Sequence, residues 1–133
     1  MSLRFLGDGS FYLLDTPDHM AGHLGALEQT GAGEWIFIGG YCCRHRALHV
    51  GMRPVSVTIG PHGTSSFHSG PETAIKSIVL VRKLERSSDA FVALAQDAIL
   101  VGRMPLYPKM LKGWRNSSWK KEVDKDVRKP YLI

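Results

Sequence analysis

The residues best suited to binding chemistry lie near the carboxyl end of the chain, where basic and aromatic side chains are interspersed. Residues 103–129 contain nine lysines and arginines, three acidic residues and two tryptophans. Cations neutralise phosphates and release counterions, while indole rings stack on unpaired bases. This pattern predicts binding of RNA, single-stranded nucleic acid or a ribonucleoprotein-like assembly. The residues assigned to this nucleic-acid-binding site are Lys109, Lys112, Trp114, Arg115, Trp119, Lys120 and Lys121.

Two other interpretations of this basic segment stay open. Tryptophans among lysines also suit the surface of an anionic membrane, although the nucleic-acid interpretation is preferred. Alternatively, Trp114 and Trp119 pack against the chain's own sheet while the lysines stay in solvent. Tryptophan is mostly buried and lysine runs are usually surface, so this last interpretation has weight of its own.

A second candidate site is the loop of residues 62–68, where two histidines stand beside hydroxyl side chains. His62 and His68 could serve as the acid and the base of phosphodiester cleavage. Arg53 or Lys76 would then stabilise the developing negative charge. The alternative function is therefore a small histidine-dependent phosphodiesterase or ribonuclease. Glycine, serine and proline also gather in ordinary turns, so a plain polar loop explains the same residues.

Metal and cofactor motifs are weak in this sequence. His19 and His23 are four residues apart, as are His45 and His49, but a zinc site needs three or four ligands. The chain has no Gly-x-x-x-x-Gly-Lys, Gly-x-Gly-x-x-Gly or Gly-x-Ser-x-Gly motif. We therefore expect no bound metal and no cofactor, and we favour a binding or assembly protein over an enzyme.

The charge is distributed unevenly along the chain. Residues 1–43 carry one basic and five acidic side chains, whereas residues 44–133 carry sixteen basic and seven acidic ones. The net charge is +5 and the isoelectric point is about 9.4. Such asymmetry suits a phosphate, an anionic lipid or an acidic protein partner, and it also suits plain solubility. A structural subunit that binds only protein, or a homo-oligomer, is a third functional class.

Composition and cysteine usage bound the class of protein. The 133 residues are 44% hydrophobic and 22% charged, which is typical of a globular domain and excludes a collagen-like, coiled-coil or disordered chain. No apolar run approaches the roughly 18–20 residues of a membrane span. Cys42 and Cys43 are adjacent, and neighbouring cysteines bridge each other poorly. We expect small apolar thiols in a reducing intracellular compartment, the cytoplasm or nucleus.

Two helices are expected from capping residues and apolar spacing. Thr16 followed by proline is typical of a helix start, and Met20, Leu24 and Leu27 then form one apolar stripe before Gly31. A second helix is expected from Ser87 or Ser88 to Gly102, because its apolar residues follow the 3.6-residue period. The expected strands are a hairpin of residues 4–6 and 10–14, then residues 34–41, 46–52, 55–59 and 74–84.

This order of elements predicts an α+β fold. We expect a small antiparallel sheet of about five to six strands, with two helices on one face and an extended basic C-terminal tail. Residues 1–104 would form the single α+β domain, and residues 105–133 the basic, tryptophan-containing extension.

Overall fold

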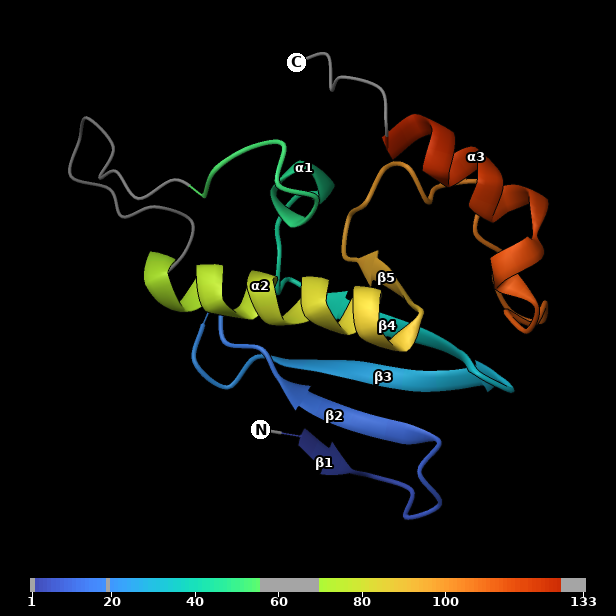
Figure 1. Ribbon diagram of the computed structural model, residues 1–133, viewed down its shortest axis with the longest axis horizontal. Coiled ribbons are helices and arrows are strands. Elements are labelled where there is room, and N and C mark those ends of the chain that lie inside the picture. The colour runs from blue at the N-terminus through green and yellow to red at the C-terminus, as the bar shows by residue number, and fades with distance from the viewer. Residues whose placement is uncertain (1, 19, 56–69, 128–133) are drawn as a thin grey trace.

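The computed structural model describes residues 2–18, 20–55 and 70–127. Within these ranges the chain forms a five-stranded mixed sheet and three α-helices, so the α+β class is confirmed (Figure 1). No helix in these ranges is long and apolar enough to cross a membrane. The elements are β1 Ser2–Arg4, β2 Phe11–Asp15, β3 Leu24–Gly31, β4 Glu34–Gly40, α1 Arg46–His49, α2 Pro71–Ser88, β5 Ala90–Leu94, the 3-10 helix η1 Trp114–Asn116, and α3 Ser118–Val127.

The sheet has the order β1-β2-β3-β4-β5. The first four strands pair antiparallel, whereas β5 pairs parallel to β4 after the chain has crossed over through α2. The predicted N-terminal hairpin is confirmed as β1 and β2, although its first strand is Ser2–Arg4 and not residues 4–6, and the predicted strand 34–41 is confirmed as β4. The expectation of a wholly antiparallel sheet is wrong, because a long helical connection places β5 beside β4 in the same direction.

The predicted helix between Thr16 and Gly31 is wrong, since the second half of this segment is strand β3 and none of its described residues is helical. The strand pairs with β2 on one side and β4 on the other, so its backbone is satisfied by sheet hydrogen bonds on both edges. Gly25 has a packing role in it. A Cβ atom at Gly25 would lie 2.3 Å from Cζ of Phe37, so glycine leaves room for this buried ring against the neighbouring strand.

We expect Gly25→Ser to lower the free energy of unfolding by about 1–3 kcal/mol, because the added side chain must displace the packed ring of Phe37. Gly70→Ser is the matched control. Gly70 is the N-cap of α2, its added Cβ would make only ordinary contacts from 3.5 Å, and serine is a good N-cap residue. Urea unfolding of both variants checks this. Equal stability of the two variants would contradict the packing role of Gly25.

The predicted central strand 74–84 is also wrong, because this segment lies within the 18-residue helix α2. The apolar run from Ile78 to Val81 suggested a strand buried on both sides. In the structure only Ala74, Ser77, Ile78 and Val81 are buried, which is the spacing of one helix face. Val79 and Leu80 point outward and are 39% and 58% exposed. The helix starts with proline in its first turn, as helices often do.

The predicted second helix, Ser87 to Gly102, is replaced by strand β5 and a series of turns. All five residues of β5 are buried, although it is the last strand of the sheet. Val92 packs into a core with Phe37 and Ile78 on one face. Phe91 packs into a second core with Trp119 on the other face. A strand covered on both faces has no polar alternation, so its composition resembles that of a helix.

Helices α2 and α3 lie on opposite faces of the sheet. The expectation that the helices cover one face only is wrong. Neighbouring residues of a strand point to opposite faces. Phe37 belongs to the core under α2, whereas Ile36 belongs to the core with Trp119 and Val123 of α3. Figure 1 shows α2 lying across the sheet and α3 apart from it, beyond β5.

The carboxyl-terminal segment is helical and packed, not extended as expected. It contains η1 and α3, and its two tryptophans are buried against β4 and β5. The domain boundary between residues 104 and 105 stays a prediction. The predicted strand 46–52 is wrong, because Arg46–His49 forms the short helix α1. Of the predicted strand 55–59, residues 56–59 lie outside the described ranges.

Candidate functional site

The ends of three strands meet at one edge of the sheet, which we call the carboxyl edge. It consists of residues 16–18 and 20–23 after β2, residues 40–46 from the last residue of β4 onward, and residues 95–99 after β5. The strand register places Asp15 opposite Leu24, and Gly40 opposite Leu94. Ligands of sheets with parallel strands commonly bind outside the carboxyl ends of the strands. Polar side chains gather at this edge, so it is the candidate site.

His23 ties the first of these segments to the second. Its Nε2 lies 3.0 Å from the backbone nitrogen of Tyr41 and accepts that N–H. Its Nδ1 lies 3.0 Å from the carbonyl oxygen of Thr16, so a neutral ring carries its proton there and donates it. Gly40 permits this approach, because a Cβ atom there would lie 2.9 Å from Nε2. Both imidazole nitrogens therefore serve as structural contacts at the carboxyl edge.

A buried ion pair ties the segment after β5 to helix α1. Nε of Arg46 lies 2.5 Å from Oδ2 of Asp97, and both side chains are only 4% exposed. Arg46 also donates to the carbonyl of Val92 at 2.7 Å. The second carboxylate oxygen of Asp97 accepts the backbone N–H of Ile99 at 3.3 Å. Charged groups that are buried away from water need such partners. These contacts fix the turn at residues 95–99.

The two adjacent cysteines are free and buried beneath the carboxyl edge. Burial is the main cause that raises the pKa of Cys42 to about 12 and that of Cys43 to about 11, and the nearby charge of Asp18 contributes to both values. Both therefore remain thiols at neutral pH, and thiols are poor nucleophiles and poor metal ligands. Their predicted role as small apolar side chains is confirmed by their place in the core with Phe37.

These thiols predict a loss of stability at high pH. The folded-state pKa values exceed the ordinary value of 9.0, so the stabilisation is full below pH 9 and is lost as the pH rises toward 11–12. Each thiol should cost about 1.4 kcal/mol of unfolding free energy by pH 10. Urea unfolding from pH 7 to 10 measures this loss. The loss should be smaller in Cys42→Ala, and an identical pH profile in that variant would contradict the assignment.

The histidine pairs of the sequence do not come together as a metal site in the described residues. His19 lies outside the described ranges. Nδ1 of His45 accepts the backbone N–H of Ala47 at 3.0 Å and so caps α1. His49 is 1% exposed, and its Nε2 lies 2.9 Å from Oε2 of Glu85. Within the described ranges no three histidine, cysteine, aspartate or glutamate side chains converge as metal donors.

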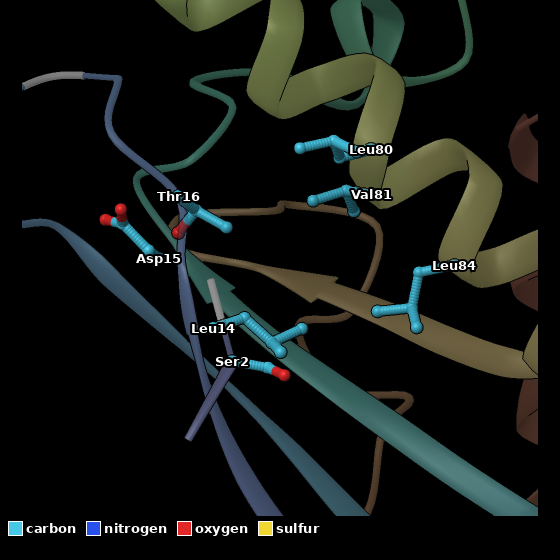
Figure 2. Close-up of a pocket in the computed structure, with 7 residues that line it drawn as sticks. All are labelled: Ser2, Leu14, Asp15, Thr16, Leu80, Val81 and Leu84. Atoms are coloured by element: carbon cyan, nitrogen blue, oxygen red, sulfur yellow. The ribbon is translucent and has the colours of Figure 1, made fainter.

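An apolar groove of about 310 Å³ lies beside this edge, between α2 and the first two strands. Figure 2 shows Leu80, Val81 and Leu84 of α2 on one side and Leu14 on the other. Its polar groups are confined to Ser2, Asp15 and Thr16. The groove offers apolar surface, but it lacks the converging polar groups that fix a reacting ligand.

The structure distributes the predicted nucleic-acid-binding residues between core and surface. Trp114 and Trp119 are only 5% and 9% exposed and pack on Phe91, so their rings are used inside the protein. Nζ of Lys120 lies 2.5 Å from Oδ1 of Asp124, and Arg115 donates to the carbonyl of Gly33 at 3.0 Å. The exposed members of the set are Lys109, Lys112, Arg115 and Lys121.

The alternative catalytic residues are not assembled by the described part of the chain. His62 and His68 lie outside the described ranges. Arg53 is exposed after α1, and Lys76 is exposed on α2. Sequence reasoning missed the Arg46–Asp97 pair, whose members are 51 positions apart. The available signal was an acid two residues after an apolar run, which becomes informative only once that run is known to be a strand.

The chain is similar to parts of several longer fungal proteins. No family model matches the sequence. The chain is 30% identical over 155 residues to metallo-hydrolase mfmC of Annulohypoxylon moriforme, a match that covers 92% of this chain and 40% of that protein. It is 30% identical over 140 residues to cytochrome P450 monooxygenase mpaDE' of Penicillium brevicompactum, covering 92% of this chain and 16% of that protein. It is 26% identical over 154 residues to gamma-lactamase FDB1 of Fusarium pseudograminearum, covering 90% of this chain and 37% of that protein.

Solved structures show a similar fold. An N-acyl homoserine lactone hydrolase with N-hexanoyl-L-homoserine bound at its catalytic metal centre superposes with a TM-score of 0.62 at 15% identity, covering 82% of this chain and 38% of that one. A quorum-quenching N-acyl homoserine lactone hydrolase gives the same score and identity, with 82% and 40% coverage. The chain thus spans less than half the length of these relatives and neighbours.

These comparisons overturn the predicted function. The prediction of a non-enzymatic protein that binds RNA or single-stranded nucleic acid, or that serves as a structural assembly subunit, is wrong, because the relatives include a metallo-hydrolase and a gamma-lactamase. The predicted nucleic-acid partner is wrong for the same reason. The physical cause of the error is the pair of buried tryptophans: the sequence alone did not show that they face the chain's own sheet. What the comparisons establish is an α+β fold shared with lactone hydrolases.

Proposed function

We propose that this chain takes part in the hydrolysis of a small acyl compound, of the ester, lactone or lactam class. The observation that carries the proposal is the 30% identity to metallo-hydrolase mfmC across 92% of this chain. The fold of lactone hydrolases over 82% of the chain supports it independently. Such a reaction adds water across the acyl bond and yields a carboxylic acid with an alcohol or an amine.

The carboxyl edge is the place where we propose that the substrate lies. The His23 contacts hold the segment after β2 against the end of β4. The Arg46–Asp97 pair holds the turn after β5 against α1. Both devices fix backbone positions without using exposed reactive groups, so their role is to position the segments that a substrate would contact.

The metal that the name of mfmC implies does not fit the described residues. Both ring nitrogens of His23 are engaged with Thr16 and Tyr41. The thiols of Cys42 and Cys43 keep their protons at neutral pH, and Asp97 is paired with Arg46. The described ranges also hold no three converging donors. The carboxyl edge as described is therefore a positioning framework.

The test measures the acid that the protein releases from a panel of acyl compounds. The released acid is titrated with base while the pH is held constant. N-hexanoyl homoserine lactone, γ-butyrolactone and γ-butyrolactam are each offered to the full chain, with added Zn²⁺ or Mn²⁺ and with a chelator. We expect acid release that is proportional to protein concentration for at least one compound. The control is the Asp97→Ala protein, which lacks the support of the turn after β5. Absence of acid release from every compound in both conditions would overturn the proposal.

The compartment is proposed on separate grounds. The two free, buried thiols support a reducing intracellular environment.

A further inference from the structure

A second groove, which we call the α1–α2 groove, combines apolar walls with two arginines. Helix α1 and the chain that follows it form one wall, and α2 forms the other (Figure 1). The groove has a volume of about 420 Å³, which lies within the range of roughly 300–1,000 Å³ that is typical of small-molecule sites. It shares no lining residue with the carboxyl edge or with the groove beside the first two strands. It is therefore a separate place where a small molecule could bind.

The apolar lining of the α1–α2 groove comes mainly from one side of α2. Ile75, Ile78 and Val79 are three and four positions apart, so they are neighbours on the helix surface. Leu48 of α1 contributes from the other wall. Ile78 is buried, whereas Ile75 and Val79 are 41% and 39% exposed. The groove thus offers a helix surface of branched aliphatic side chains that a hydrocarbon chain could cover.

Arg82 joins the two walls of the groove. Its Nε donates to the carbonyl oxygen of His49, and its Nη2 donates to the carbonyl oxygen of Leu48 at 2.5 Å. These hydrogen bonds attach α2 to the end of α1, so the walls are held in place before any ligand arrives. Most of the donors of this guanidinium are used inside the protein, but its positive charge remains beside the groove.

Arg53 supplies the cation whose donors are available to a ligand. Its side chain is exposed, and within the described residues its guanidinium forms no hydrogen bond and no ion pair. No acidic side chain is among the described residues that line the groove. A guanidinium presents its N–H donors as a planar fork that matches the two oxygens of a carboxylate. The groove is therefore complementary to a ligand with an anionic end and an apolar body.

We propose that the α1–α2 groove binds a medium-chain alkyl carboxylate. The carboxylate pairs with the guanidinium of Arg53, and the alkyl chain covers Ile75 and Val79. Neither contact is sufficient alone, because an exposed ion pair contributes little in water and an apolar wall does not orient its ligand. This inference goes beyond the proposed hydrolysis and does not depend on it, since the two places share no residue.

The test is a calorimetric titration of the full chain with octanoate, octanamide and butyrate, below the concentration at which octanoate forms micelles. We expect saturable binding of octanoate. Octanamide has the same chain without the charge, and it should bind about tenfold more weakly or worse. Butyrate has the same charge with four fewer methylenes. Each buried methylene contributes roughly a fourfold gain in affinity, so butyrate should also bind at least about tenfold more weakly.

Two arginine variants test the anionic end. Arg53→Gln should weaken octanoate binding about tenfold or more. Arg86→Gln is the control, because it changes an exposed arginine in the last turn of α2 that does not line the groove, and it should leave the affinity unchanged. Both side chains are exposed, so the melting temperatures should stay close to that of the parent chain.

Two variants of neighbouring residues on α2 test the apolar body. Val79→Ser should weaken octanoate binding about threefold to tenfold, because it removes methyl groups that the alkyl chain covers. Leu80→Ser is the control. Leu80 is 58% exposed and lines the groove beside the first two strands, so its replacement should leave octanoate binding unchanged.

The inference would be overturned by an absence of octanoate binding, or by equal affinity for octanoate and either of the other two probes. Unchanged affinity in Arg53→Gln or Val79→Ser would also contradict it. A loss in Leu80→Ser as large as that in Val79→Ser would place the alkyl chain elsewhere on α2 and would contradict the assignment as well. The readout is heat of binding to a compound without an acyl bond to hydrolyse, so failure of the hydrolysis assay leaves this test unaffected.

Discussion

Asp97→Ala should lower the free energy of unfolding by about 3–5 kcal/mol, because it leaves the Arg46 guanidinium buried without its counter-charge. Both side chains are 4% exposed, so water cannot replace the lost carboxylate without opening the structure. The backbone N–H of Ile99 would lose its acceptor as well. Urea unfolding followed by circular dichroism measures the change.

The matched control is Asp124→Ala, which removes the acid of the Lys120–Asp124 pair on α3. That pair is also 2.5 Å long, but its aspartate is 50% exposed. Pairs of this kind four residues apart on a helix contribute about 0.3–0.5 kcal/mol. If the two variants lose the same stability, the buried pair does not hold the turn after β5 in the way described.

Trp119→Ala should also lower the free energy of unfolding by about 3–5 kcal/mol, because it empties the core on the second face of the sheet. The indole is 9% exposed and meets the ring of Phe91 edge-on at 5.3 Å between centroids. The substitution also removes much of the contact that holds α3 against β4 and β5. Thermal unfolding and urea unfolding both report this loss.

Tyr107→Ala is the control for this variant, since it removes an aromatic ring from the same carboxyl-terminal segment. Tyr107 is 97% exposed, so its replacement should change stability by less than about 0.5 kcal/mol. A Trp119→Ala protein as stable as the Tyr107→Ala protein would show that the segment is not docked on the sheet.

The sequence predicted the elements whose local signals agree with their tertiary environment. The hairpin of β1 and β2 has glycine-rich turn residues between two apolar runs, and β4 is rich in strand-forming residues bounded by glycines. In both cases one local pattern was sufficient, because neighbouring strands in sequence are also neighbours in the sheet.

The sequence misled where burial is decided by distant parts of the chain. The apolar run that includes Val79 and Leu80 suggested a buried strand, yet these two side chains are largely exposed on α2. Conversely, the sequence of β5 was interpreted as part of a helix. The strand is apolar throughout because α2 covers one of its faces and α3 the other. The sequence of a five-residue strand does not show which of its faces a helix from elsewhere in the chain will cover.

The candidate site was predictable only in fragments. His23 stood out as a member of a spaced histidine pair, but its partners are the carbonyl of Thr16 and the backbone nitrogen of Tyr41, which no side-chain motif reveals. Arg46 and Asp97 meet only because β4 and β5 lie side by side. The segment around Trp114 is clearly enriched in basic and aromatic residues. Its tryptophans are used in core packing, and its charged residues are mostly ordinary surface residues.

The measurement that tests the central claim most directly is a nitrogen–proton NMR titration of the full chain with the lactone of the hydrolysis assay. The claim is that a small acyl compound lies at the carboxyl edge. We expect the resonances that shift to belong to residues 40–46 and 95–99, with those of Lys109, Lys112 and Lys121 unchanged. Shifts confined to the carboxyl-terminal basic segment, or a spectrum unaffected at millimolar lactone, would contradict the account.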